Sequence, residues 1–292
     1  MADAATAREP AAVTRGRAAL RPTLRNRLVL FGAVLVLGLG TLAIFAGVIA
    51  PYDPTEMKVV NALKAPSWAH PFGTDRFGRD VLSRTIYGSR IAFGVALSSI
   101  GMALTVGAAL GLIGGYFGGW PDVVIGRVMD IWFSFPTLIL AIAIAAMLGP
   151  GLDNAVLAIA VVYAPLFSRV ARGSVIAERA KDHVVAALGM GAGAPRIVFR
   201  HILPNIAAPL IVQASVSLAY AILTEASLSY LGLGTQPPDP SWGTMLIEGR
   251  TYLETAPWMS IFPGLAIMLA VLAFNLCGDG LRSILDPQLR GR

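Results

Sequence analysis

The three lysines of this chain are the first residues to test for chemistry, because a phosphate-binding loop requires one of them. Such a loop places Gly-Lys before Ser or Thr, so that backbone amides and the lysine ammonium hold the phosphate oxygens. Here the lysines follow Met57, Leu63 and Ala180, and the glycine series near residue 190 follows a helix-like stretch instead of a strand. The sequence therefore predicts that this chain holds no ATP and hydrolyses none.

Residue types that bind metals or form disulfides are scarce. His70, His183 and His201 are scattered without metal-ligand spacing. The single cysteine, Cys277, lies in an apolar run and is interpreted as a small buried hydrophobic residue. We therefore expect no catalytic residues, no metal site and no cofactor in this chain.

Two acidic residues within apolar segments need an explanation, because ionisable groups in a membrane span are costly and mark function by default. Asp130 lies three residues after Arg127, so that a local ion pair at the start of a helix explains both. Glu225 has no basic residue within a turn. Two interpretations stay open for Glu225: it lines a substrate path and binds a peptide amine, or it bonds Ser or Thr hydroxyls on adjacent helices.

The elements that carry these residues are membrane helices. The chain is 55% hydrophobic and 14% charged, with a mean hydropathy of +0.68, whereas soluble domains carry about 25% charged residues. A spanning helix needs about 20 mostly apolar residues, and the first such run is too long for a signal peptide. Six runs qualify: Leu28–Ala50, Ile91–Trp120, Ile131–Leu148 as the continuation of a helix from near Val123, Ala155–Val175, Ile206–Leu233 and Ala256–Gly278.

Basic residues indicate the orientation. With both termini in the cytosol, 16 of the 23 Lys and Arg residues lie inside, as the positive-inside rule requires. The net positive charge is thereby explained without a nucleic-acid partner. We expect a basic cytosolic tail over 1–27, the first helix and an outer loop over 28–90, the main transmembrane domain over 91–281, and a cytosolic tail over 282–292.

A repeat of small residues marks one face of the second predicted helix. Ala103, Gly107, Gly111, Gly115 and Gly119 recur every four residues. Small residues on one face let another helix approach closely. Close helix packing is the preferred interpretation, with a pore-lining face as the alternative.

The inner loop over about 176–205 is the most informative segment. We expect a short helix over Ala177–Leu188, a glycine-rich turn, and a second short helix with Pro195 in its first turn, ending before Pro204. An exposed apolar patch on the first helix is typical of a partner-binding surface, and a helix lying on the lipid surface is the alternative. The predicted patch consists of Val184, Val185, Ala187 and Leu188.

This loop resembles the EAA loop of bacterial ABC importer permeases, whose pattern is Glu-Ala-Ala, three residues, Gly, and later Leu-Pro. Val185 occupies the Glu position, and the matching residues are Ala186, Ala187, Gly191, Leu203 and Pro204. Other motifs resemble the second, C-type permease of the dipeptide/oligopeptide/nickel branch. They are His70-Pro-Phe-Gly-Thr-Asp75, Gly78-Arg-Asp80, Ser83-Arg84, Gly118-Gly-Trp with Asp122, Arg127 with Asp130 and Pro136, Arg200-His-Ile-Leu-Pro-Asn205, Leu228-Ser-Tyr-Leu-Gly-Leu-Gly234, Pro240-Ser-Trp-Gly243 and Asp286-Pro-Gln-Leu-Arg290.

The resemblance implies an all-α integral membrane protein of the inner membrane, with the type I ABC importer (MetI-like) permease fold. It implies a heterodimer with a sister permease, two ABC ATPase subunits that hold ATP and Mg, and a substrate-binding protein outside. Residues 185–187, Gly191, Leu203 and Pro204 would couple the chain to its ATPase. Val185 removes a charged contact there and enlarges the apolar patch.

The resemblance implies peptides as the expected cargo, although nickel, opines and other small solutes use similar permeases. Two other classes of function compete. A secondary transporter or channel acting without an ATPase should show inverted repeats with helix breaks near mid-membrane, and a membrane enzyme needs clustered acids, His or Cys within the spans. The sequence shows neither pattern.

Overall fold

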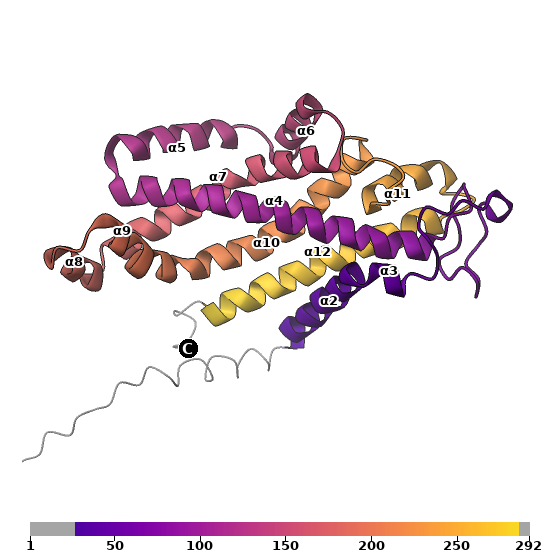
Figure 1. Cartoon of the computed structure of the whole chain (residues 1–292), viewed down its shortest axis with the longest axis horizontal. Helices are drawn as coiled ribbons and strands as arrows, with labels where there is room; N and C mark the ends of the chain where they lie inside the picture. Colours follow the sequence, from indigo (N-terminus) through magenta and orange to yellow (C-terminus); the bar gives the residue numbers. More distant parts are fainter. Residues whose placement is uncertain (1–26, 286–292) are drawn as a thin grey trace, which may run out of the picture.

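The computed structural model describes residues 27–285, which form an elongated all-helical bundle (Figure 1). Most of the expected tails, and the motif at 286–290, lie outside the described residues. The long helices are α2 (Arg27–Ile44), α4 (Val81–Phe117), α5 (Gly119–Phe133), α6 (Thr137–Leu148), α7 (Leu152–Arg179), α10 (Leu203–Tyr230) and α12 (Trp258–Leu285). The shorter elements are α3 (Ala46–Ile49), η1 (Val59–Asn61), α8 (Asp182–Gly189), α9 (Ala194–Arg196), η2 (Ile197–Ile202), α11 (Trp242–Gly249) and η3 (Arg250–Tyr252).

Several helices are suited to cross a membrane by length and composition. Four qualify in residues 27–285, namely α4, α7, the continuous run Ala194–Tyr230 and α12, and a fifth qualifies if α5 and α6 form one span. The first predicted run is divided at Phe45 into α2 and α3, and α2 is a shorter apolar helix. The chain is therefore a multi-pass membrane protein.

The prediction of one continuous helix from near Val123 to Leu148 is wrong. The chain breaks between α5 and α6, and the two helices are bent by 93°. Pro136 explains the break, because proline has no N–H for the helix and disfavours a helical conformation at the preceding residue, Phe135.

The predicted boundaries of the inner loop also need correction. The first short helix is divided, since α7 continues to Arg179 and α8 begins at Asp182. Pro195 lies in the first turn of α9 as expected. The chain does not leave the helix before Pro204, however: α9, the π-helical turn η2 and α10 follow one another without a gap. Pro204 lies near the beginning of α10, directly after the π-helical turn, where the regular α-helical hydrogen-bond pattern is already interrupted.

Helices α4 and α7 pack closely along an extended contact. A Cβ added at Gly107 would overlap the carbonyl oxygen of Ala164, and one at Gly111 would overlap that of Ser168. At Gly115 a Cβ would lie 2.9 Å from the carbonyl oxygen of Arg172. The preferred interpretation of the small-residue repeat, close packing against a neighbouring helix, is confirmed for these three glycines.

The two ends of the bundle carry different elements. Helices α8 and α9 lie at one end, and the segment before α4 lies with α11 at the opposite end (Figure 1). A small separate core of Val81, Met245, Ala256 and Met259 holds the α11 end together. Phe72 and Phe262 stack beside it with ring centroids 3.8 Å apart.

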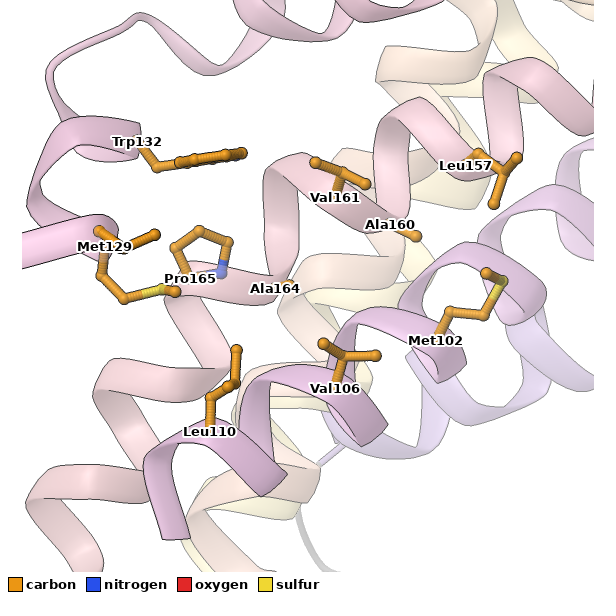
Figure 2. A pocket seen from close by; sticks show the side chains of 11 residues that line it. Met102, Val106, Leu110, Met129, Trp132, Leu157, Ala160, Val161, Ala164 and Pro165 are labelled. Atoms are coloured by element: carbon orange, nitrogen blue, oxygen red, sulfur yellow. The ribbon is translucent and has the colours of Figure 1, made fainter. Parts of the chain in front are cut away.

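An apolar cavity of about 230 Å³ lies between α4, α5 and α7. Figure 2 shows side chains from all three helices around it, among them Met102, Trp132 and Leu157. Pro165 in the middle of α7 also lines it. Its walls are almost wholly hydrocarbon, which suits lipid or apolar side chains and offers no recognition of a polar solute.

Candidate functional site

Helix α8 has one buried and one exposed face. It packs on α7 and η2, with Val184 and Ala187 only 0% and 4% exposed. Val185, Leu188 and Met190 are 54%, 42% and 82% exposed. The predicted patch is therefore wrong in two of its four members, because positions three apart share one helix face and that face is turned inward. We call the exposed set Val185, Ala186, Leu188 and Met190 the coupling face.

Gly191 ends this helix as the sequence predicted. Its φ of +81° lies in the left-handed region that favours glycine. The Gly191 amide donates to the carbonyl oxygen of Leu188 at 2.9 Å, and the Ala192 amide donates to that of Ala187 at 3.1 Å. These bonds satisfy the last carbonyls of α8, as in common helix C-terminal caps.

Leu203 and Pro204 stand at the beginning of α10, directly after the turn η2 on which α8 rests. Leu203 packs against the hydrophobic core, whereas Pro204 is exposed. The structure thus brings the predicted coupling residues to one end of the bundle, but only some of them face outward.

Polar contacts fix the position of α8 relative to the bundle. Glu178, buried at the end of α7, accepts a hydrogen bond from the Lys181 ammonium at 2.6 Å, and its second oxygen lies 3.3 Å from His183 Nε2. Arg179 donates to the carbonyl oxygen of Tyr116, near the end of α4, at 2.6 Å. A force applied to α8 therefore acts on α7 and α4 together.

Two arginines in the second half of α7 pair with acids of α5. Arg172 forms two hydrogen bonds with Asp122, one of them 2.6 Å long between Nη2 and Oδ2. Arg169 Nη2 lies 3.5 Å from Asp130 Oδ1. The predicted local pair of Asp130 with Arg127 is wrong, because α5 lies against α7 and the acid pairs across the two helices.

Glu225 is fully buried near the C-terminal end of α10. Its Oε1 accepts hydrogen bonds from Ser229 at 2.7 Å and from Thr235 at 3.3 Å. Its Oε2 has no hydrogen-bond partner in the described residues. The hydroxyl interpretation matches these contacts, but the hydroxyls come from the same helix and the loop after it, where adjacent helices were expected.

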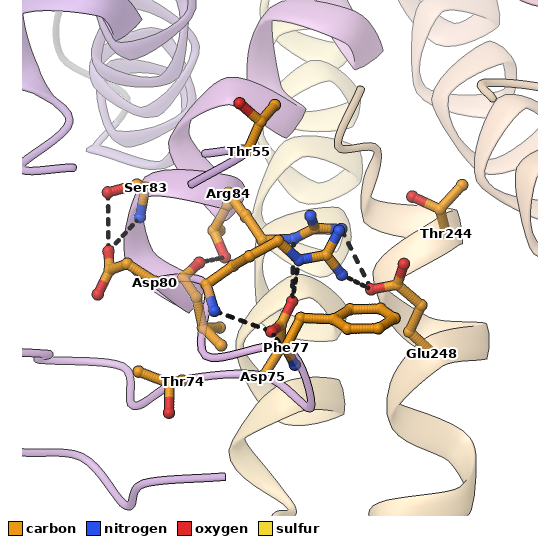
Figure 3. A network of polar contacts seen from close by, with 12 residues as sticks. Thr55, Thr74, Asp75, Phe77, Asp80, Ser83, Arg84, Thr244 and Glu248 are labelled. Atoms are coloured by element: carbon orange, nitrogen blue, oxygen red, sulfur yellow. Dashed lines mark hydrogen bonds and ion pairs between the residues drawn. The ribbon is translucent and has the colours of Figure 1, made fainter. Parts of the chain in front are cut away.

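A buried charge network joins the outer loop to α11 (Figure 3). Arg79 pairs with Asp75 and donates to Glu248 at 2.7 Å. Arg84, 2% exposed at its side chain, donates to the same Glu248 oxygen at 3.2 Å and lies 3.7 Å from Asp75. Two cations thus face two carboxylates, and this balance is what permits their burial.

The helix that follows this network begins at a second polar cluster. Asp80 caps α4, accepting from the Ser83 amide at 2.7 Å and from the Ser83 hydroxyl at 2.8 Å. Its other oxygen lies 2.9 Å from His70 Nδ1. The motifs His70–Asp75, 78–80 and 83–84 therefore form one structural unit at the α11 end of the bundle.

Glu248 is the residue of this network that the sequence did not reveal. One signal in the sequence could have pointed to it. Arg79 and Arg84 lie close together with few acids nearby, and burying both arginines requires a carboxylate from elsewhere in the chain. Within residues 27–285, no group of three or more His, Cys, Asp or Glu is placed to hold a metal ion.

An all-helical, multi-pass chain with an exposed apolar helix at one end has the features of a membrane transport component that docks on a partner. The chain belongs to the family of binding-protein-dependent transport system inner membrane components, whose model matches residues 107–291. A second model, the N-terminal TM domain of oligopeptide transport permease C, matches residues 14–66.

Named relatives cover nearly the whole chain. The dipeptide transport system permease protein DppC of Alkalihalophilus pseudofirmus is 45% identical over 96% of this chain and 92% of its own length. The di/tripeptide transport system permease protein DppC of Pseudomonas aeruginosa is 47% identical over 91% and 89%. The glutathione transport system permease protein GsiD of Pectobacterium atrosepticum is 42% identical over 92% and 90%.

Solved structures agree on the fold. A chain of the inward-facing MetNI methionine ABC transporter superposes with a TM-score of 0.56 at 20% identity, covering 70% of this chain and 97% of that one. The expected MetI-like fold is therefore confirmed.

The chain is thus a permease subunit of an ABC importer, of the C type, in the inner membrane. ATP hydrolysis belongs to separate subunits of such importers, and ATPase and substrate-binding proteins are its partners. The alternative of a transporter acting without an ATPase is set aside.

Proposed function

We propose that this chain is half of the membrane path of a di- or oligopeptide importer. It pairs with a sister permease, and both are surrounded by lipid. ATP and Mg are held by the two ATPase subunits. The cargo class is supported by the names of three relatives at 42–47% identity, all of which are permeases for peptides or glutathione.

Six crossings with both termini in the cytosol are part of this proposal. In Figure 1 α8 and α11 lie at opposite ends of the bundle, as the predicted inner and outer loops require. In the six-crossing arrangement α2 and the bent pair α5–α6 supply the two crossings that length and composition alone leave open.

The observation that carries the proposal is the coupling face of α8. Four apolar residues in or just after a short helix remain exposed although their neighbours Val184 and Ala187 are buried. The helix is held to α7 by Glu178, and α7 is held to α4 by Arg179. A partner that binds Val185 and Leu188 can therefore move two long helices, which is what an ATP-driven cycle requires.

Uptake by the reconstituted importer tests the cargo. This chain, its sister permease, the ATPases and the binding protein are placed in proteoliposomes, and uptake of a labelled dipeptide, a tripeptide and Ni²⁺ is compared. ATP-dependent uptake of peptides is expected. Uptake of Ni²⁺ with no uptake of either peptide would overturn the proposed cargo.

A further inference from the structure

A groove of about 490 Å³ lies between α6, α7 and α10. Hydroxyl-bearing side chains from all three helices line it: Thr137, Tyr163, Tyr220, Thr224 and Ser227. Tyr220 and Leu223 at its rim are 55% and 47% exposed, so the groove opens to the outside of the chain. The apolar cavity of Figure 2 also adjoins α7 but offers almost no polar surface, whereas this groove carries hydroxyl groups among its leucines.

The groove continues a polar stripe along α10. Gln213, Ser217, Tyr220, Thr224 and Ser227 follow one another at spacings of four and three residues, so they lie on one face of the helix. The stripe is about 21 Å long at 1.5 Å per residue. It therefore extends over about two thirds of a hydrocarbon core about 30 Å thick.

Hydrocarbon is a poor environment for this stripe. Polar groups without partners in lipid are costly, and polar residues of spans face the protein interior or a water-filled cavity. Gln213 donates to Ser217 at 3.2 Å, which satisfies part of the stripe. Ser227 donates to the carbonyl oxygen of Leu223 at 2.8 Å. Tyr220 stays 55% exposed, and its hydroxyl suits a water-filled path better than hydrocarbon.

The hydrogen bonds across the groove leave an acceptor free. The Thr224 hydroxyl donates to the carbonyl oxygen of Tyr220 at 2.8 Å. The Tyr163 hydroxyl, 3.3 Å from Thr224 Oγ1, must then be the donor of that contact. A hydroxyl that donates its single proton keeps lone pairs to accept another bond. The Tyr163 oxygen is thus poised to accept an N–H from a molecule in the groove.

We infer that this groove is the cargo-facing wall of the chain and that it recognises peptides through their backbone amides. The inference rests on the proposed peptide cargo and adds the residues and the chemistry. Hydroxyl and carboxamide groups bond N–H and C=O groups, which every peptide carries, and offer no charge to select particular side chains. Glu225, although next to Thr224, is fully buried and does not line the groove.

Thiol labelling tests the water-facing character independently of cargo. The chain has one cysteine, so Cys277→Ala gives a thiol-free background. Ser227→Cys and Tyr220→Cys are compared with Thr105→Cys, a control on an exposed part of α4 outside the groove. A charged, membrane-impermeant methanethiosulfonate should modify the groove positions at least about tenfold faster in the full importer, because only a thiolate in water reacts. Equal rates at the three positions would overturn the inference.

Uptake measurements test the recognition. Tyr163→Phe and Thr224→Val each remove one hydroxyl and keep the shape of the side chain. Thr105→Val is the matched control, because Thr105 donates to the carbonyl four residues earlier as Thr224 does. Loss of one net hydrogen bond predicts about 2- to 13-fold slower dipeptide uptake for the groove variants, with no change for the control.

A cargo analogue separates recognition from packing. The depsipeptide, in which an ester replaces the amide, lacks the N–H that Tyr163 would accept. Relative to wild type, Tyr163→Phe should lose most of its preference for dipeptide over depsipeptide. An unchanged preference would overturn the role of Tyr163. If the wild-type importer takes up no peptide at all, the proposed cargo fails, while thiol labelling still decides whether the groove faces water.

Discussion

Arg79 of the outer loop and Glu248 of α11 are 169 residues apart in sequence and are joined by a 2.7 Å hydrogen bond. The bond ties the segment that leads into α4 to the short helix between α10 and α12. Trp242 adds a second tie, since its indole N–H donates to the carbonyl oxygen of Thr85 at 2.9 Å. The α11 end of the bundle is therefore one structural unit.

Glu248→Gln should destabilise this unit. It leaves Arg79 and Arg84 with Asp75 as their remaining carboxylate. Breaking a buried ion pair costs about 3–5 kcal/mol, and the 16% exposure of the Glu248 side chain places this variant at the lower end. Thermal unfolding in detergent measures the effect. Glu254→Gln, exposed in the next loop, is the control, and equal melting temperatures of the two variants would contradict the network's role.

Val185→Asp should separate the permease from its ATPase and leave the fold intact. Val185 is 54% exposed, so a charge there stays in water in the free chain and becomes buried only at an interface. A mismatched buried charge costs about 2–5 kcal/mol at an interface, or roughly a 30-fold or greater loss of docking. Co-purification of the ATPase measures this.

The controls for Val185→Asp lie elsewhere in the same chain. Val60→Asp makes the same change at an exposed outer residue and should leave ATPase binding unchanged. Ala187→Asp should instead lower the stability of the permease itself, because Ala187 is 4% exposed. Normal ATPase binding by Val185→Asp would mean that α8 lies on the lipid surface.

Gly191→Ala and Gly189→Ala should have opposite effects. A Cβ meets no neighbour within 4 Å at either position, but Gly191 has a φ of +81°. Alanine there costs about 1–2 kcal/mol, whereas alanine at Gly189 within α8 should gain about 0.5–1 kcal/mol. Stimulation of the ATPase and the melting temperature are the readouts. A melting temperature that falls equally in both variants would show that the left-handed turn is not what matters.

Glu225→Gln should transport cationic and neutral peptides alike. Gln keeps an oxygen that accepts from Ser229 and Thr235, and the site is sealed from the groove. Glu225→Leu removes the acceptor and should lower stability by about 1–3 kcal/mol, because two buried hydroxyls lose a partner. A selective loss of cationic cargo in Glu225→Gln would instead place Glu225 in the substrate path.

Alkaline phosphatase fusions test the six-crossing arrangement. Fusions after Lys64 and Asp239 should be active, and a fusion after Gly193 inactive, because the enzyme folds only outside the cytosol. The positive-inside distribution motivates this result. Activity at Gly193 would put α8 on the wrong side for an ATPase.

The sequence predicted the helices well where local composition alone determines the structure. The long apolar runs, the packing of Gly107 and Gly111 and the turn at Gly191 follow from local residue types. The bend before Pro136 was also readable, since proline interrupts helices by its own chemistry, yet the apolar run suggested continuity.

Contacts between distant segments could not be predicted from spacing. Asp130 pairs with Arg169 instead of the nearer Arg127, and Arg84 bonds Glu248 from another helix. Which face of α8 is buried depends on η2, eight or more residues further on. These ion-pair partners and the buried face of α8 depend on how the helices pack, which a single sequence does not show directly.

The uninterrupted run from Ala194 to Tyr230 has a mechanical consequence. Its 37 residues make a rod about 55 Å long at 1.5 Å per residue. One end adjoins the segment that would receive the ATPase, and the hydroxyl groove lies near the other. When a stiff rod is tilted at one end, the displacement of the other end grows with its length. A small rotation of the helix near Ala194 would therefore move Ser227. The π-helical turn Ile197–Ile202 and Pro209 within α10 are irregular points along this rod, and their stiffness sets how much of the movement reaches Ser227.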